Sequence, residues 1–310
     1  MGISLTAIVL AGLILLCWVW RSAQAGDKGQ YCVGVVLSER IRPYHEALLS
    51  FEEVLRQNRI EVKVFELREG RGTPPKDLQA ALLTDRYLVW AAIGPQATEV
   101  LWSAGKASEF KRIYGMVLNP HEIIERGCGV PLNIPIPDQV ETISRVLPRL
   151  KKVGVLFDPR YNGEFIRIAR QEGAERGLQI VPVEVSDKAE IKPALERIWT
   201  RIDALWLIPD PTVISESLVR YVIKEGLANQ TATIGYNRFF CHSGAAMSFV
   251  LDYAKIGQQM ALLCLKVLRG GECVSLVPFY EVWLNARALE VLGLEADLQA
   301  LGNISIKVIP

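Results

Sequence analysis

The sequence has almost no net charge and no cysteine spacing of the kind that binds a metal. Its 35 Lys and Arg residues are balanced by 34 Asp and Glu residues, and the basic ones are scattered along the chain. Because nucleic-acid binding needs a clustered basic surface, a nucleic-acid partner is disfavoured. No C-x-x-C occurs among the six cysteines. Neither a zinc site nor a disulfide framework is therefore predicted, although a single disulfide remains open.

Signatures of common enzymes are also missing. The chain has no G-x-S-x-G, no H-E-x-x-H and no Walker A segment, and no G-x-G-x-x-G follows the first predicted strand. Only three histidines occur, His45, His121 and His242. His242 follows Cys241, but neighbours in sequence rarely supply the geometry of a nucleophile and its base. We therefore predict no catalytic residue, no metal site and no cofactor.

The first 25 residues differ in composition from the rest of the chain. Residues 3–20 carry no charge, Arg21 ends this apolar run, and Ala23-Gln24-Ala25 has the small-x-small form of a signal-peptidase site. We predict a signal peptide over residues 1–25 and a periplasmic or extracytoplasmic protein. The alternative is a retained membrane anchor, since about 18 apolar residues can just span a bilayer. No second long apolar run follows, so the remainder is predicted to be soluble.

From residue 31 onward, short apolar runs alternate with helical patterns. The predicted strands are rich in Val and most are continuously apolar; they cover residues 31–37, 60–67, 87–93 and 111–118. The predicted helices between them cover residues 43–58, 75–83 and 96–105. This alternation indicates a parallel sheet that is covered by helices on both faces.

The same order of elements then begins again. Val33-Gly34-Val35-Val36 recurs as Val153-Gly154-Val155-Leu156, at the start of a second series. That series comprises strands at 153–157, 179–185, 204–208 and 232–236, and helices at about 163–176, 188–200 and 213–228. We therefore predict an α/β fold made of two doubly wound parallel-sheet lobes.

Two further segments predict how the lobes are joined. Residues 129–143 are Pro-rich and residues 244–253 look extended, so both are interpreted as crossover strands between the lobes. A helix at 252–268 and a strand at 279–285 follow, and we assign the chain after about residue 253 to the first lobe. The predicted domains are residues 26–135 with 254–310 for lobe one, and 136–253 for lobe two. Several crossing strands would form a hinge, with a cleft between the lobes.

Small and polar residues follow several strands at the point where a helix would begin, at 94–98, 158–163 and 209–212. In open α/β sheets these carboxyl ends line the ligand crevice, and helix amino termini offer N–H groups to an anion. We predict that the amides of residues 96–98 and, opposite them, 161–163 face the ligand, while Asp210 faces a cationic group. The alternative is ordinary turn chemistry, because Gly, Pro, Asp and Asn are common in any such turn.

Some of these segments also match the sequence patterns of a known family. The pattern GVLY(D/N)P is represented by residues 154–159, P-D-x-x-V by residues 209–213, and GA(L/M)xSxxxDYxxLG by residues 244–257. Over residues 30–295 the chain resembles the exported substrate-binding proteins of ABC transporters, in the subfamily with tryptophan- and tyrosine-binding members. The resemblance implies the type I periplasmic-binding-protein fold, in which two lobes close on one small solute.

Two departures from the family pattern concern the expected site. The turn Gly94-Pro95-Gln96-Ala97 lacks the hydroxyl residue that the family usually has, and Asn119 stands where the family has an acid. The solute is therefore predicted only as an amino acid or a related small carboxylate. We expect it to contact Leu37, Ser38, Gly94, Gln96, Ala97, Val117, Asn119, Tyr161, Asn162, Asp210, Thr212 and Tyr236.

The family resemblance also implies a role and a partner. We predict a monomer that captures its solute outside the cytoplasm and delivers it to an ABC permease in the membrane. The alternative is a ligand-sensing domain that presents the solute to a membrane receptor. An enzyme is the third hypothesis.

Overall fold

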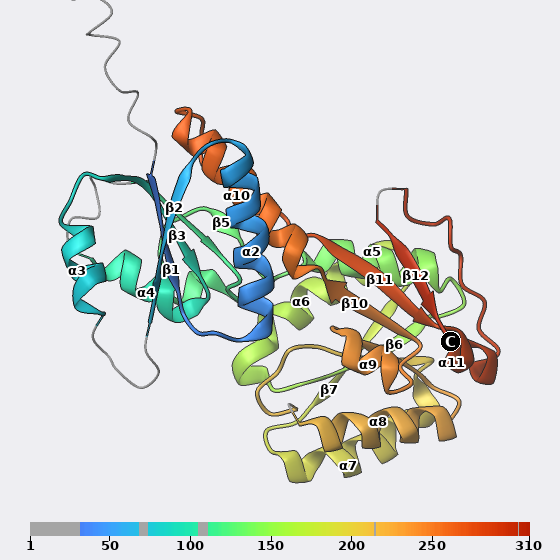
Figure 1. Cartoon of the computed structure of the whole chain (residues 1–310). Coiled ribbons are helices and arrows are strands. Elements are labelled where there is room, and N and C mark those ends of the chain that lie inside the picture. Colours follow the sequence, from blue (N-terminus) through green and yellow to red (C-terminus); the bar gives the residue numbers. More distant parts are fainter. Residues whose placement is uncertain (1–31, 68–73, 105–110, 214, 303) are drawn as a thin grey trace, which may run out of the picture.

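The computed structural model describes residues 32–67, 74–104, 111–213, 215–302 and 304–310, which fold into two lobes (Figure 1). The predicted signal peptide, residues 1–25, lies outside the described residues. Each lobe is built on one sheet, with five strands in the first and seven in the second. Among the described helices, none combines the length and the hydropathy that a membrane crossing requires.

The first sheet has the order β2-β1-β3-β4-β5, and all its strand pairs are parallel. Its strands are β1 (Cys32–Leu37), β2 (Glu61–Glu66), β3 (Tyr87–Ile93), β4 (Lys111–Gly115) and β5 (Gly129–Val130). Helices α2 (Arg42–Gln57) and α10 (Tyr253–Leu268) cover one face, while α3 (Lys76–Leu82) and α4 (Pro95–Ser103) cover the other. Because both faces are covered, β1 is buried along its whole length.

The second sheet has the order β12-β11-β10-β9-β8-β6-β7, in which only β10 and β11 pair antiparallel. Its strands are β6 (Lys152–Phe157), β7 (Gln179–Glu184), β8 (Ala204–Leu207), β9 (Ala232–Gly235), β10 (Met247–Leu251), β11 (Tyr280–Asn285) and β12 (Ile306–Ile309). One face packs against α5 (Ile136–Val146), α6 (Pro159–Glu175) and α11 (Ala286–Leu292). The other packs against α7 (Lys188–Ile198), α8 (Glu216–Ala228) and α9 (Arg238–His242). Two 3₁₀ turns, η1 (Pro120–Glu122) and η2 (Trp199–Arg201), lie in connections.

The two sheets repeat one arrangement, as the recurring Val-Gly-Val motif predicts. The order β2-β1-β3-β4 in the first lobe corresponds to β7-β6-β8-β9 in the second. The motif strands β1 and β6 each lie between two parallel neighbours. Gly34 of the motif lies beside Trp90, and a Cβ at this position would overlap the indole ring. The predicted class of two parallel-sheet α/β lobes is therefore confirmed.

The first crossover is shorter than the sequence suggests. Residues 136–143 were expected to be extended, but they form most of α5, which begins at Ile136. Pro137 lies in the first turn, where its missing N–H breaks no helical hydrogen bond. Val140, Ile143 and Val146 are buried at helical spacing. Residues 136–143 are therefore helical, because their apolar residues recur at helical spacing and the prolines precede the helix or lie in its first turn.

The chain after residue 253 is divided between the two lobes, which corrects the expectation that all of it joins lobe one. Helix α10 does pack in the first lobe, against α2. Strand β11 instead pairs with β10, from Met247↔Leu284 to Leu251↔Tyr280, and β12 pairs with β11. The segment 244–253, expected to be a crossover alone, thus contains a strand of the second sheet. If β11 did not pair with β10, one edge of β10 would be left unpaired, and the apolar β11 would have no partner strand.

Helices α2 and α10 lie side by side although the second lobe separates them in sequence (Figure 1). Gly257 of α10 allows the two helix backbones to approach closely, because a Cβ there would overlap the carbonyl oxygen of Ala47. Around it, Phe51, Ile256 and Met260 are fully buried. The core of the first lobe is therefore built from segments that precede β6 and follow β10 in sequence.

Candidate functional site

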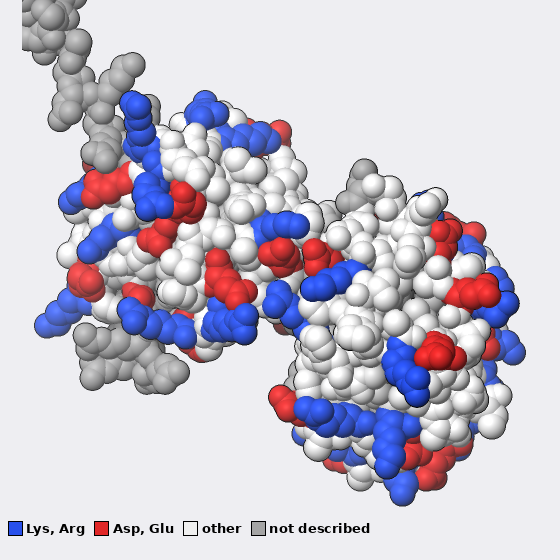
Figure 2. Space-filling view, turned by 45° about the vertical axis from the view of Figure 1, so that its right-hand side comes forward, with Lys and Arg blue, Asp and Glu red and all other residues white. Residues whose placement is uncertain are grey.

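The carboxyl ends of the first-lobe strands lie on the side of that lobe nearest the second lobe (Figure 1). Figure 2 shows an open notch between the lobes, below their junction. The predicted contacts follow β1, β3 and β4 in one lobe and β6, β8 and β9 in the other. Equivalent turns of the two lobes thus carry the residues that the sequence singled out.

In the first lobe, the amino terminus of α4 is already capped by another turn. The amide of Ala97 donates to Ser38 Oγ at 2.8 Å, and the amide of Thr98 donates to the Gly94 carbonyl oxygen at 3.2 Å. These two amides were expected to face the solute, and that expectation is wrong for this state. Among the described residues, no hydrogen bond uses the amide of Gln96, whose side chain is exposed. Of the three amides predicted to face the solute, only that of Gln96 therefore remains available.

Gly94 is required by the side chains that surround this turn. Its φ is +94°, and a Cβ there would lie 2.6 Å from Ser38 Oγ and 2.8 Å from Tyr44 Cε2. The Tyr44 ring therefore lies directly against the turn. Burial raises the pKa of the Tyr44 hydroxyl, with smaller contributions from Glu39 and Tyr253. Tyr44 lies in the first turn of α2, so its ring reaches this site from the helix that follows β1.

In the second lobe, the turns after β6 and β8 are joined by the carboxylate of Asp210. Asp210 Oδ2 accepts from the Asp158 amide at 2.8 Å and from Asn162 Nδ2 at 2.8 Å, while Oδ1 accepts from the Thr212 amide at 2.9 Å. The Asp210 side chain is fully buried. Asn162 reaches it because its backbone leaves the helical conformation, with φ −125° and ψ 21°. Asp210 and Asn162 thus belong to one preformed network.

Asp158 is the second carboxylate of this network and caps α6. Its Oδ1 accepts from the Arg160 amide at 2.9 Å, and Arg160 Nε lies 3.0 Å from each carboxylate oxygen. Thr212 Oγ1 donates to Oδ2 at 2.8 Å. The Arg160 guanidinium, helped by the backbone and Thr212 donors, holds the pKa of Asp158 well below its ordinary value although burial opposes this. Two carboxylates and one guanidinium leave the network with one net negative charge.

This capping also corrects the predicted donors of the second lobe. The amides of Tyr161 and Asn162 both donate to the Asp158 carbonyl oxygen at 3.0 Å, so neither is directed at a solute. Helix α6 begins at Pro159, earlier than expected, because Asp158 is a strong N-cap and Pro159 fits the first helical position. A helix terminus already capped by an ionised carboxylate is a poor site for an anion.

The remaining predicted contacts have mixed surroundings. The side chains of Leu37 and Val117 are fully buried in the first-lobe core. Asn119 has a φ of +50°, and its Oδ1 accepts from Asn133 Nδ2 at 2.7 Å. The Tyr161 side chain is 55% exposed. Tyr236 is half-buried, and burial followed by the nearby Asp210 carboxylate raises its pKa.

A family model described as ABC transporter substrate binding protein matches residues 122–295, which is more than half of the chain. The chain belongs to this substrate-binding protein family. No curated protein sequence matches the chain. The family supports the capture of a small molecule and an ABC permease as the partner.

Solved structures agree with this substrate-binding protein in fold. A ligand-free, open substrate-binding protein with adhesive properties from Clostridium difficile matches with a TM-score of 0.72 and 17% identity, over 90% of this chain and 100% of that chain. A Streptococcus pneumonia protein in complex with L-Trp matches with a TM-score of 0.58 and 15% identity, over 91% and 100%. A periplasmic ribose ABC transporter protein from Conexibacter woesei matches with a TM-score of 0.58 and 12% identity, over 83% and 92%. At these identities the likeness concerns the type I periplasmic-binding-protein fold alone.

Cys241, which precedes His242 in this substrate-binding protein, is not arranged as a nucleophile. Cys241 is fully buried, and burial raises the pKa of its thiol to about 12. His242 is exposed, and its ring lies 5.6 Å from that of Trp283. Because the thiolate is the reactive form, Cys241 is protonated and inert at neutral pH. Within the described ranges, no cluster of three or more His, Cys, Asp or Glu side chains could hold a metal ion.

Proposed function

We propose that this substrate-binding protein captures a small solute, an amino acid or a related small carboxylate, in the cleft between its lobes and delivers it, unchanged, to an ABC importer. The supporting observation is a difference in charge between the two walls. On the first lobe, the Gln96 amide at the start of α4 has no partner among the described residues. On the second lobe, the Asp158–Asp210 network carries a net negative charge.

This difference suggests an orientation for a zwitterionic solute. A carboxylate would accept from the Gln96 amide, where the α4 amino terminus adds favourable potential. An ammonium group would be attracted by the net negative charge of the Asp158–Asp210 network, which acts through its potential because both carboxylates are buried. The rings of Tyr44 and Tyr236 would border the apolar part of the solute. A solved structure of similar fold in complex with L-Trp supports an amino-acid solute.

An extracytoplasmic location is part of the proposal. The predicted signal peptide supports export. The disulfide between Cys128 and Cys273 supports it independently, because disulfides persist in oxidising compartments and are rare in the cytosol. We propose that the exported protein acts as a monomer.

A thermal-shift screen tests the solute class. The full-length protein would be heated with each of the twenty L-amino acids and, for comparison, with D-ribose. A solute at about 100 times its Kd stabilises the folded state by about 2.7 kcal/mol, so at least one amino acid should raise the Tm clearly. Mass spectrometry should recover that amino acid unchanged. If only ribose raises the Tm, the amino-acid assignment is wrong while solute binding stands.

A matched pair of variants tests the orientation. Gln96→Pro removes the free amide at a helix position that tolerates proline, whereas Gln96→Ala keeps the amide and removes only the side chain. Losing one hydrogen bond to a charged group costs about 1.5–3 kcal/mol, which weakens Kd roughly 10- to 150-fold. Calorimetry with the amino acid found in the screen should show this loss for Gln96→Pro alone. Equal Kd values for the two variants would exclude the Gln96 amide as a contact.

A further inference from the structure

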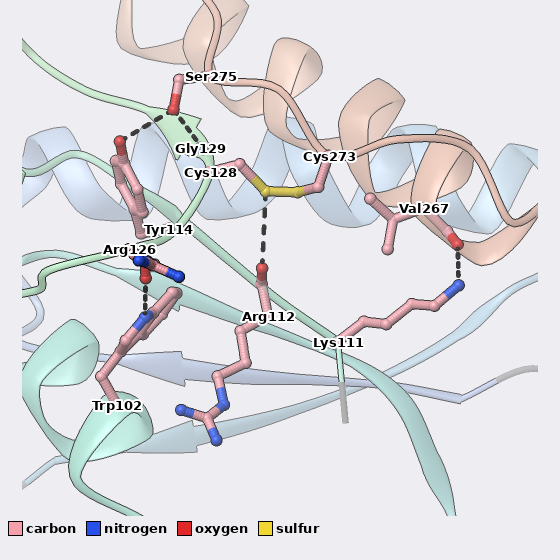
Figure 3. Close-up of a disulfide and its surroundings, with 10 residues drawn as sticks. All are labelled: Trp102, Lys111, Arg112, Tyr114, Arg126, Cys128, Gly129, Val267, Cys273 and Ser275. Carbon is pink, nitrogen blue, oxygen red and sulfur yellow. Dashed lines mark hydrogen bonds between the residues drawn. A yellow bond between two sulfur atoms is a disulfide. The ribbon is translucent and has the colours of Figure 1, made fainter. Parts of the chain in front are cut away.

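The third crossover, residues 269–279, runs from the end of α10 to the start of β11 and is fastened to the first lobe along much of its length. Figure 3 shows Cys273 of this crossover joined to Cys128, which precedes β5, by a disulfide. The two cysteines are 145 residues apart in sequence. We call residues 273–276 the strap.

Hydrogen bonds continue the attachment beyond the disulfide (Figure 3). Ser275 Oγ lies 3.2 Å from the Tyr114 hydroxyl and accepts from the Gly129 amide at 3.3 Å. The Leu276 amide donates to the Gly129 carbonyl oxygen at 2.9 Å. Because β5 is the last strand of the first sheet, the strap covers its open edge much as another strand would. Cys128 Sγ is also 3.9 Å from the Arg112 carbonyl oxygen, a packing contact since a disulfide sulfur carries no proton.

A glutamine of α10 extends the attachment to the end of the crossover. Gln259 Nε2 donates to the Val277 carbonyl oxygen at 2.8 Å, and Gln259 Oε1 accepts from the Phe279 amide at 2.8 Å. The Lys255 ammonium lies 3.8 Å from the centroid of the Phe279 ring. The Phe279 carbonyl oxygen then accepts from the Asp252 amide at 3.2 Å. The contacts of the third crossover with the first lobe therefore end at the pair Asp252–Phe279, where it meets the second crossover, the connection from β10 to α10.

We propose that the Cys128–Cys273 disulfide makes the third crossover a rigid extension of the first lobe and restricts its bending to the Asp252–Phe279 pair. The lobes then open and close about one short pivot. Without the disulfide, the strap detaches from β5, and the lobes sample a wider range of orientations. None of these contacts involves a predicted solute contact, so the proposal is independent of the solute and is tested on ligand-free protein.

Hydrogen exchange tests whether the disulfide holds the strap. Dithiothreitol supplies two electrons and two protons and converts the disulfide into two thiols. Amide exchange in peptides covering residues 273–279 should then accelerate at least tenfold, while exchange in β1 and β3 stays unchanged. The Cys128→Ala/Cys273→Ala variant should show the fast exchange already, and dithiothreitol should not alter it further. Unchanged exchange in the strap, or equal acceleration throughout the first lobe, would overturn the proposal.

Single-molecule energy transfer tests the pivot. Dyes attached through azidophenylalanine at the exposed positions Leu83 and Lys192, one in each lobe, report the distance between the lobes. The distance distribution should broaden in the double cysteine variant and in Gln259→Ala. It should stay narrow in Gln258→Ala, which changes the exposed neighbour of Gln259. Distributions that remain identical after the strap is released would refute a role in the hinge.

Discussion

Replacing Asp210 by asparagine should destabilise the second lobe strongly, because the side chain holds two turns together while fully buried. An asparagine oxygen in the place of Oδ2 can still accept from Asp158 and Asn162. Its NH₂ group would then face the Thr212 amide. Since both groups are donors, the 2.9 Å hydrogen bond of the wild type is lost. The change therefore removes one hydrogen bond and turns two charge-assisted ones into neutral ones.

The size of the effect follows from these three bonds. A hydrogen bond to a charged group contributes about 1.5–3 kcal/mol, and a neutral one about 1 kcal/mol less. Asp210→Asn should thus lower the free energy of unfolding by about 3.5–5 kcal/mol. That is a large share of the roughly 5–15 kcal/mol typical of a folded domain. With a urea dependence of about 2 kcal/mol per molar, the unfolding midpoint should fall by about 2 M.

Asp203 provides a matched control at the opposite end of the same strand. It is exposed, and a single oxygen, Oδ2, accepts from the amides of Lys151 and Lys152 at 2.7 and 2.8 Å. An asparagine oxygen can accept from both, and because Asp203 is exposed, solvent already screens its charge. Asp203→Asn should therefore cost less than about 1 kcal/mol. Urea unfolding followed by circular dichroism would compare the two variants. Equal midpoints would show that the buried network contributes no more than an exposed turn.

Three further predictions concern other parts of the site. The pKa of Asp158 is lower in the folded than in the unfolded protein. Its stabilising contribution is therefore present above the ordinary Asp pKa of about 4 and is lost as pH falls below that value. Asp158→Asn should destabilise the protein at pH 7 and much less at pH 2. Gly94→Ala should lower the Tm, because φ is +94° and the new Cβ would lie 2.6 Å from Ser38 Oγ; a wild-type Tm would show that the turn can relax. Cys241, with a buried thiol of pKa about 12, should resist iodoacetamide in native protein at pH 8 and react in urea, and rapid native labelling would contradict its burial.

Strands and lobes were predictable from the sequence because they depend on local patterns. A strand buried on both faces must be continuously apolar, and the expected limits of β3, residues 87–93, agree with the structure. The repeated Val-Gly-Val motif likewise identified equivalent strands in two lobes. Helix α5 was missed because prolines dominate the start of its segment, although proline is well tolerated in a first turn.

The details of the candidate site were not predictable, because they depend on contacts between distant residues. Ser38 caps α4 across 59 residues, and Asp210 reaches the Asp158 amide across 52. Nothing near Ala97 in sequence indicates that its amide is already used, whereas the amide of Tyr161 is used locally, by the helix start that Asp158-Pro159 forms. The pairing of Cys128 with Cys273 is also long-range. Sequence patterns therefore located the turns correctly but did not reveal how their polar groups are satisfied.

The close packing of α2 against α10 at Gly257 has a consequence for how the chain must fold as it is made. The first lobe contains the earliest described strands, yet the helix that covers one face of its sheet follows the whole of β6 to β10. Residues 32–130 alone would leave Phe51 and the apolar face of β1 partly uncovered until α10 has emerged. Between β5 and α10 come four consecutive parallel strands of the second lobe, β6 to β9, which emerge before α10 does. Neither lobe is therefore complete until the chain beyond β10 has emerged, and during that interval a chaperone that shields apolar surface would protect it from aggregation.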